Sequence, residues 1–431
     1  MLLINKIFYQ IKKKMYKPSK SCLNPLFVST IIIQPVLRTI SQFIIRSYVK
    51  RPKEKIKLYQ PLLYFSFSFL TNFITLKPSK VLLISLVLIV MCAHMFYEKG
   101  FLVFIAYSLA TTIFYRTLSC LLTKYSYQMA LYNSKSKDPS SVNKESKQNL
   151  FNLKFFERSG VILIYLTDAA SDFLGKTFKV ERIKITSFVN YIYGFSFISL
   201  ILLSNFKYSD DLSKEYKEKD HQKENKSKLK RDLIIFIVLT YIYSLFMCFH
   251  QNSMPIRTGD KLYLFNSVKI AGNIFDIAWI FNFKTFKIFS TPKMIVCAFF
   301  TQFIVSVFYA TDFSIKESEY TFLLNTFFEC LNRFSSSCYH IFLNNTILEH
   351  FSCGGYSMNY MYRAAYFFQG LNKISVFLLS TFNIFILEKY YNITDIPRII
   401  KYNYLMYSTI ILIFLPYTFI AYKNFSIKTN I

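Results

Sequence analysis

The sequence predicts an all-α polytopic membrane protein of about twelve transmembrane helices arranged as two six-helix bundles. Three observations support this fold class. The 431-residue chain is 53% hydrophobic, above the roughly 45–50% apolar content of soluble domains. It contains repeated apolar runs of about 18 residues or more, the length that crosses a bilayer. A strongly charged segment, 206–231, divides these runs into two similar groups.

The charged segment 206–231 reads FKYSDDLSKEYKEKDHQKENKSKLKR and contains no apolar run that could enter a core. We therefore predict an N-terminal bundle over 1–205, a cytoplasmic linker over 206–231 and a C-terminal bundle over 232–431. A hydrophilic linker between two such bundles is typical of secondary transporters. The alternative is a loop within some other polytopic protein.

The first half contains apolar runs that predict spans near 24–49, 58–76, 81–96, 101–122, 159–178 and 186–206. The first of these is broken by Pro35 and Arg38, and whether this span begins at Asn24 or nearer the N-terminus stays open. Residues 123–152 form a polar insertion rich in Ser, Lys and Asn, which we expect to be disordered.

The second half predicts spans near 233–248, 263–283, 294–310, 320–343, 362–387 and 402–422. With both termini in the cytoplasm, the cytoplasmic segments collect about 30 Lys and Arg and the outer loops about 15, as the positive-inside rule requires. The glycosylation sequon at Asn392 then falls in an outer loop. The plasma membrane is the default location for such a carrier.

The net charge of +28 does not indicate a nucleic-acid partner, because the basic residues lie in short loops between apolar runs, where they set topology. The eight cysteines are spread singly and form no CxxC pair, so neither a metal site nor a disulfide framework is indicated. The chain has no phosphate-binding GxxxxGK[ST] loop, which argues against an ATP-driven pump within it. We predict no enzyme activity and no cofactor.

Ionisable residues within the predicted spans each require an explanation, since a charge costs at least ~2.5–3.5 kcal/mol at the centre of a membrane helix. Glu329 and Arg333 are four residues apart, a spacing that suits a salt bridge on one helix face. Lys269 and Asp276 are seven apart and also share a face. Each of these helices could satisfy its own charges by internal pairing, which is the structural alternative to a functional site.

Asp168 and Asp172 lie four apart on one helix face, where two carboxylates repel each other. They would need cations from other helices, and the candidates are Arg116, Arg333 and Lys373. Opposite charges from several helices around a midplane cavity allow a transporter to bind a charged solute and couple a proton or counter-ion. Histidines at 94, 250 and 340 lie in or near spans, where a hydrogen-bonded core role is favoured over a proton relay.

Local sequence patterns resemble one transporter family. LTNFITLKPSKVLLI (70–84) resembles a TDYLxYKPxLLL-like pattern of the reduced folate carrier and thiamine transporter family. FERSGVILIYLTDAASDFLGK (156–176) is similar to that family's fifth helix, and LNRFSSSCYHIFLNNTIL (331–348) to its FRxxYxFxxxIATFQIA pattern. FFQGLNKISVFLLSTF (367–382) resembles its VFGxNTF pattern. These matches occur in the family's order across nearly the whole chain.

The resemblance implies a divergent member with the major facilitator fold, which takes up folates or thiamine by alternating access. Arg333 falls on the arginine of the FR pattern, which the family uses to meet an anionic substrate. Asn266 and Asn372 fall on two family asparagines. Other family positions are changed, because Lys20 and Asn72 replace acidic residues and Lys176 replaces a glutamine. The loss of acidic groups favours an anionic, folate-like solute over cationic thiamine.

We therefore predict a secondary active transporter for folate or a related anionic vitamin, with the bilayer and a small molecule as partners. The residues expected to contact the solute are Arg333, Arg116, Lys373, Asn266 and Asn372. Those expected to balance charge or couple transport are Asp168, Asp172, Glu329, Asp276 and Lys269. The coupling solute stays open between a proton and an organic anion. The alternatives are a transporter of thiamine, a nucleotide or another metabolite, or a non-transport membrane enzyme or scaffold.

Overall fold

A computed structural model of the chain describes residues 139–180, 226–257, 262–286, 291–311, 319–351 and 358–426, with isolated residues between 84 and 199. The elements in this part of the chain are all helical. They are α6 (Pro139–Phe178), α9 (Lys226–Arg257), α10 (Leu262–Phe286), α11 (Thr291–Tyr309), α12 (Glu319–Thr346), the π-helical turn η3 (Ile347–Phe351), α13 (Met358–Tyr391) and α14 (Ile396–Ser426). The predicted all-α class is confirmed.

Each of the six spans predicted in the second half coincides with one long helix, from α9 to α14. The helices are longer than the apolar runs, so that α9 already begins at Lys226, inside the segment predicted as a linker. The first-half spans before 139 lie outside the described residues apart from single positions. The division into two bundles therefore stays a prediction.

The prediction that residues 123–152 are disordered is wrong for 139–152, because α6 begins at Pro139 and continues without interruption to Phe178. Proline is well suited to the first turn of a helix, where its missing N–H leaves no bond unmade. The Ser- and Lys-rich composition of 139–152 does not exclude a helix. The span predicted at 159–178 is the apolar part of this longer helix.

Three helices among the described residues are long and apolar enough to cross a membrane by length and composition, within Ser227–His250, Ile374–Tyr391 and Arg398–Phe425. Lys293–Tyr309 is a shorter apolar helix. α10 and α12 are absent from this group because they carry buried polar and charged side chains along one face. Among the described residues of the second half, α10 and α12 thus carry the buried Lys269, Asp276, Glu329 and Arg333.

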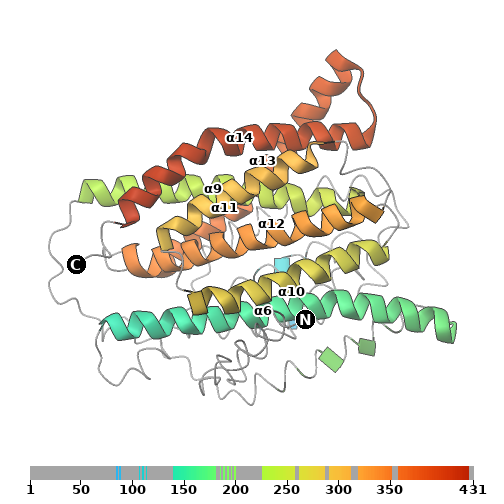
Figure 1. Cartoon of the computed structure of the whole chain (residues 1–431), viewed down its shortest axis with the longest axis horizontal. Helices are drawn as coiled ribbons and strands as arrows, with labels where there is room; N and C mark the ends of the chain where they lie inside the picture. Colours follow the sequence, from blue (N-terminus) through green and yellow to red (C-terminus); the bar gives the residue numbers. More distant parts are fainter. Residues whose placement is uncertain are drawn as a thin grey trace, which may run out of the picture.

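α6, α9 and α10 lie roughly along a common direction (Figure 1). α9 packs against α13 and α14, and α11 packs against α12 and α14. α10 packs against α12 on one side and against α6 on the other, and Figure 1 shows α6 and α10 side by side. α10 is thus the helix through which α6, from the first half, meets the second half.

The core of the second half is built largely from aromatic rings on α9, α11, α12 and α14. Tyr243 stacks on Tyr339 with a centroid distance of 4.1 Å, and Phe249 stacks on Tyr407 at 4.4 Å. Such ring pairs add directional contacts to the burial of large apolar surfaces. They hold α9 in register with α12 and α14, and so fix the position of His250, the residue that follows Phe249.

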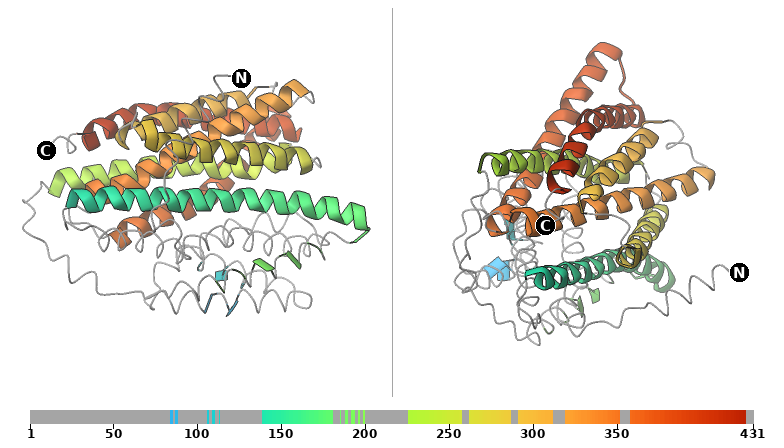
Figure 2. Two further views of the ribbon diagram at one scale, coloured as in Figure 1. Left: turned by 60° about the horizontal axis from the view of Figure 1, so that its bottom comes forward. Right: turned by 60° about the vertical axis from the view of Figure 1, so that its left-hand side comes forward.

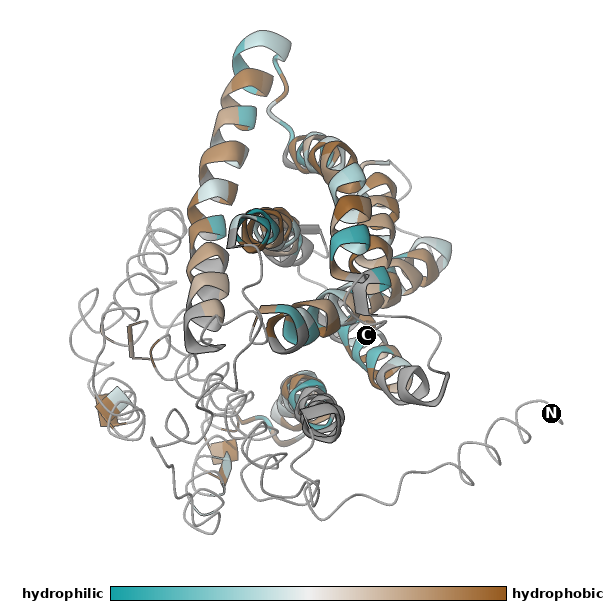
Figure 3. Cartoon of the chain, turned by 90° about the vertical axis from the view of Figure 1, so that its left-hand side faces the viewer, coloured by the Kyte–Doolittle hydropathy of each residue, from teal (hydrophilic) through white to brown (hydrophobic). Residues whose placement is uncertain are grey.

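The C-terminal part of α13 projects beyond the other helices (Figure 2). Its large apolar side chains, including Leu378, Phe382 and Phe385, are exposed. Figure 3 shows that this projecting helix is predominantly hydrophobic. An apolar surface on a helix whose backbone groups are satisfied internally is what a bilayer accommodates.

The turn between α13 and α14 contains Asn392, an exposed residue with a φ of 51°. Asparagine adopts this left-handed conformation more readily than most residues. Asp395 then caps α14, since its carboxylate accepts a hydrogen bond from the N–H of Arg398 at 3.4 Å. The sequon noted above therefore lies in an exposed turn.

Candidate functional site

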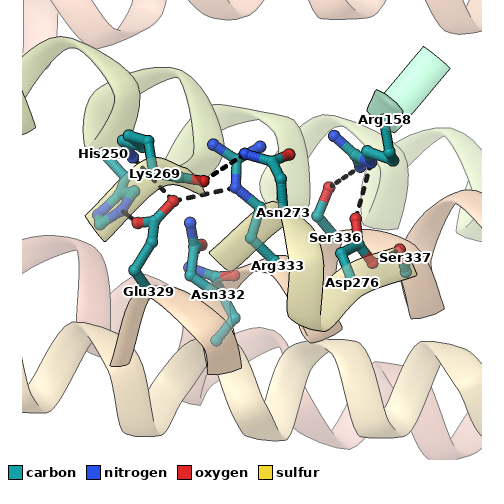
Figure 4. A network of polar contacts seen from close by, with 11 residues as sticks. Arg158, His250, Lys269, Asn273, Asp276, Glu329, Asn332, Arg333, Ser336 and Ser337 are labelled. Atoms are coloured by element: carbon teal, nitrogen blue, oxygen red, sulfur yellow. Dashed lines mark hydrogen bonds and ion pairs between the residues drawn. The ribbon is translucent and has the colours of Figure 1, made fainter. Parts of the chain in front are cut away.

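α10 and α12 each carry a row of polar side chains on the face that packs against the other helix. Lys269, Asn273 and Asp276 recur at intervals of three or four on α10, which places them on one helix face. Glu329 and Arg333 do the same on α12. Figure 4 shows these side chains pointing toward one another between the helices.

Gly272 permits the close approach of α10 and α12 at this position. A Cβ atom at Gly272 would lie 2.9 Å from Cγ of Glu329 and 3.3 Å from Cγ of Arg333. The first of these distances is too short for two carbon atoms, so any larger residue would displace a neighbour. The glycine therefore positions the stems of both charged side chains against α10.

Glu329 is the centre of a group that we call the Glu329 cluster, formed by Glu329, Lys269, Arg333 and His250. Lys269 Nζ donates to Glu329 Oε1 at 2.8 Å, and Arg333 Nε donates to the same oxygen at 2.9 Å. His250 Nε2 lies 3.3 Å from the other oxygen, Oε2. Glu329 and His250 are fully buried. Two cations and one carboxylate leave a net charge of +1 when the imidazole is neutral.

Arg333 is anchored at one edge of its guanidinium only. Its Nε bonds Glu329, whereas its two terminal nitrogens make no hydrogen bond or ion pair with any residue that the structure describes. The side chain keeps 10% of its surface exposed. The two terminal nitrogens of a planar guanidinium held in this way can donate hydrogen bonds to both oxygens of one carboxylate.

A second ion pair, which we call the Arg158 pair, joins Arg158 on α6 to Asp276 on α10. Arg158 Nε lies 2.7 Å from Asp276 Oδ2, and Arg158 Nη2 donates to Ser336 Oγ at 3.2 Å. The hydroxyl of Ser337 also donates to Asp276. Asp276 is fully buried and Arg158 nearly so. The pair thus connects the first half of the chain to two helices of the second half.

A third buried group lies among α9, η3 and α14. His350 Nε2 lies 3.1 Å from Asp232 Oδ2, and Asn424 Nδ2 donates to Asp232 Oδ1 at 3.2 Å. Phe351 and Phe425 pack around the imidazole. This group links three elements that are distant in sequence and takes no part in the other two.

Several predicted site residues come together in the structure. The expected Glu329–Arg333 salt bridge is confirmed. Lys269 and Asp276 are also buried, but the expectation that they could pair within α10 is wrong, because each reaches a different helix. Tertiary contacts supply closer partners than a residue two turns away on the same helix.

Asn372, on α13, is fully buried, and neither polar atom of its amide has a hydrogen-bond partner among the described residues. The backbones of Lys373, Asn266 and Asp168 lie in α13, α10 and α6, and their side chains are outside what the structure describes. Arg116 lies outside the described residues altogether. The roles of these four residues stay predictions.

Asp172 does not need a cation from another helix. It pairs with Lys176, one turn further along α6, at 3.0 Å, and the two side chains are 41% and 79% exposed. α6 ends at Phe178, and the next residue, Lys179, has a φ of 52°. Asp172 therefore has a cation partner on its own helix that the sequence analysis did not consider, and a cation from Arg116, Arg333 or Lys373 stays a prediction.

Sequence reasoning missed Arg158 and assigned no partner to His250. Arg158 stands just before the apolar run that begins at Ser159, so it resembled a charge flanking a span. The available signal was the lack of any helix-breaking residue between Pro139 and Gly160, which extends the helix past Arg158. For His250, nothing in the sequence indicates that α12 brings a glutamate to it.

No protein-family model and no curated protein sequence matches this chain. Solved structures do match it, over nearly its whole length. A major facilitator superfamily transporter, FucP, in the outward conformation has a TM-score of 0.57 at 12% identity, covering 93% of this chain and 99% of that one. The nucleoside transporter NupG has a TM-score of 0.53 at 10% identity, covering 94% and 100%. A peptide transporter, POT, in complex with alafosfalin has a TM-score of 0.56 at 11% identity, covering 91% and 94%.

Identities of 10–12% show a shared fold and leave the narrower resemblance to the reduced folate carrier family as a prediction. The matches extend over both halves of the chain and over nearly all of each transporter. Together with the helical architecture, they show that the chain has the all-α fold of transporters of the major facilitator superfamily.

Proposed function

We propose that the protein is a secondary transporter that moves an organic anion across a membrane by alternating access, and that folate or a related vitamin is its solute. Proteins of similar fold transport nucleosides and peptides. Those neighbours support transport over an enzyme or a scaffold, but their names do not select a solute. The choice of solute class rests on the buried charges of this chain.

The observation that carries the proposal is that the terminal guanidinium nitrogens of Arg333 have no partner among the described residues. A buried guanidinium with two terminal nitrogens lacking a partner among the described residues is costly to desolvate, and a carboxylate arriving from solution would satisfy it. The Glu329 cluster already has a net charge of +1, which attracts an anion and repels a cation. Cationic thiamine is therefore the weaker candidate.

Folate in particular is proposed from the sequence resemblance, and its glutamate carboxylates suit the two terminal nitrogens of Arg333. The unpartnered amide of Asn372 would provide a polar contact for the same solute. The plasma membrane as location and cytoplasmic termini complete the proposal, since a vitamin carrier with this loop charge distribution is expected there.

The test is uptake of radiolabelled folate and thiamine by cells expressing the chain, with surface levels measured for every variant. We expect Arg333→Ala to reduce folate uptake roughly ten- to a hundredfold, because a hydrogen bond to a charged group contributes about 1.5–3 kcal/mol. Arg333→Lys keeps the charge without the paired terminal nitrogens and should be intermediate. Arg398→Ala removes an exposed arginine from α14 and is the matched control.

Wild-type folate uptake by Arg333→Ala at normal surface level would reject Arg333 as the anion site. Uptake of thiamine without folate would keep a transporter and reject the anionic solute. The Arg333→Lys variant guards against a trivial loss of folding, because it leaves the ionic contact with Glu329 available.

A further inference from the structure

The two oxygens of Glu329 have different partners. Oε1 accepts hydrogen bonds from both Lys269 and Arg333, at 2.8 and 2.9 Å. Oε2 faces His250 Nε2 at 3.3 Å. One edge of the carboxylate therefore holds the two cations, and the other edge faces a titratable imidazole. A proton arriving at the second edge can therefore weaken the attraction between the first edge and the two cations.

His250 is enclosed by titratable groups from several helices. Glu329 of α12 faces Nε2, and the Tyr404 hydroxyl of α14 lies 2.9 Å from Nδ1. The Tyr309 ring of α11 lies 5.1 Å from the imidazole, centroid to centroid. Lys269 of α10 and Arg333 of α12 bond the other oxygen of the carboxylate (Figure 4). The ring is fully buried.

The partners of His250 fit both of its protonation states. In the neutral ring, Nε2–H can donate to Glu329 while Nδ1 accepts from the Tyr404 hydroxyl. In the protonated ring, Nδ1–H donates instead, and the oxygen of Tyr404 accepts, because a hydroxyl can do either. A proton can therefore be held at this place without leaving a buried polar atom of the ring unsatisfied.

A bound proton changes the charge available to an anion. Whether it rests on His250 or on Glu329 Oε2, the net charge of the Glu329 cluster rises from +1 to +2. A neutral Glu329 also loses most of its electrostatic attraction for Lys269 and Arg333, so both cations become available to a solute. Proton and anion then favour each other's binding, and by thermodynamic linkage the effect is reciprocal.

We propose that His250 and Glu329 form a proton-binding site that is loaded together with the solute anion, so that the protein works as a proton–anion symporter. This inference rests on the proposed function and adds the coupling ion to it. The proton bound at the His250–Glu329 edge is released on the other side of the membrane with the anion, which returns the carboxylate to Lys269 and Arg333.

The test uses the purified full-length protein in proteoliposomes with radiolabelled folate. Two rates are compared, namely uptake driven by an inward proton gradient and counterflow against internal unlabelled folate at equal pH. Counterflow needs no net proton movement, because the carrier can return with solute and proton bound. We expect a gradient to raise wild-type uptake at least threefold. In Glu329→Gln, the ratio of gradient-stimulated to unstimulated uptake should fall to about one, with counterflow still measurable.

His250→Asn should reduce the same ratio, and Glu388→Gln, which neutralises an exposed carboxylate on α13, is the matched control with a wild-type ratio. Glu329→Gln leaves Lys269 and Arg333 uncompensated and could fail to fold. The double variant Glu329→Gln with Lys269→Met keeps the net charge at +1 and serves in its place. A wild-type ratio in these variants, or wild-type uptake that ignores the gradient, would overturn the proposal.

Failure of folate as the solute can be distinguished from failure of the proton-binding site. If the wild type neither accumulates nor exchanges folate, the proposed solute fails, and the proton site is judged without solute. The melting temperature of the detergent-purified protein is then measured over about pH 5–8, where histidine titrates. The site would be supported if the difference in melting temperature between wild type and His250→Asn varies with pH, while the difference between wild type and His340→Asn does not. Parallel profiles would overturn it.

Discussion

The Glu329 cluster and the Arg158 pair are both buried on α10, two turns apart, yet they differ in composition and connection. The Glu329 cluster draws its members from α9, α10 and α12, all in the second half, and has an excess of one positive charge. The Arg158 pair is charge-balanced and links α6 to α10. An unbalanced cluster within one half is suited to bind an ion, whereas a balanced pair across the halves is suited to hold them together.

Under the alternating-access transport proposed above, the difference has a mechanical meaning. One half rocks against the other around a fixed site in such proteins, so contacts within a half persist while contacts between halves change. The Glu329 cluster should therefore stay assembled through the cycle. The contact between α6 and α10 is where the Arg158 pair would respond to movement of the halves.

The largest effect is expected from breaking the Arg158 pair. Arg158→Met or Asp276→Leu alone leaves a buried unpaired charge, and each should reduce the free energy of unfolding by roughly 3–5 kcal/mol. The double variant should be less destabilised than either single variant, because no charge then remains unpaired. Thermal or denaturant unfolding of the purified protein measures all four members of this cycle.

The swap Arg158→Asp with Asp276→Arg is the control for charge complementarity, and it should recover part of the lost stability. Strictly additive effects of the single changes would show that the two side chains do not interact, and the contrast with the Glu329 cluster would then disappear.

An intermediate effect is expected from Gly272→Ala, which tests the packing beneath the Glu329 cluster. The added Cβ would meet Cγ of Glu329 at 2.9 Å, and such overpacking costs about 1–3 kcal/mol. Because the stems of Glu329 and Arg333 shift, the KM for folate uptake should rise. The same substitution in a Glu329→Ala background should cost less, since the clashing atom is gone.

Gly175→Ala, near the end of α6, is the matched control for Gly272→Ala, and helix propensity predicts that it is neutral or stabilising. Equal penalties for Gly272→Ala with and without the Glu329 side chain would contradict the proposed contact.

The smallest effect is expected at Asp172 and Lys176, the exposed pair on α6. Exposed ion pairs contribute about 0–1 kcal/mol, so Asp172→Asn and Lys176→Gln should change the melting temperature and folate uptake little. Loss of uptake in Asp172→Asn at a normal surface level would restore the original prediction that this carboxylate takes part in transport.

The sequence predicts the helices of the second half well because their apolar runs are long and the turns between them are short. It also predicts the Glu329–Arg333 bridge, since a spacing of four residues fixes the contact within one helix. Partners on different helices could not be predicted in the same way. Lys269 and Asp276 share a helix face, and only the packing of α10 between α12 and α6 decides that each turns to another helix.

The errors on α6 have one physical origin. The residues 139–152 are mostly polar, which favours a prediction of disorder, but a polar segment can also form a helix because the backbone bonds are satisfied within it. Arg158 follows this segment and precedes the apolar run, so the sequence does not indicate that it pairs with Asp276. His250 needed knowledge of α12, which no local pattern on α9 contains.

The polarity of α10 and α12 also affects how the protein is made. A charged residue at the centre of a membrane helix costs at least ~2.5–3.5 kcal/mol on insertion scales, and each of these helices carries two, Lys269 and Asp276 on α10 and Glu329 and Arg333 on α12. Neither enters lipid alone as readily as α9 or α14. These charges find their partners only when α10, α12 and α6 meet, so we expect membrane insertion of α10 and α12 to be coupled to the assembly of these helices.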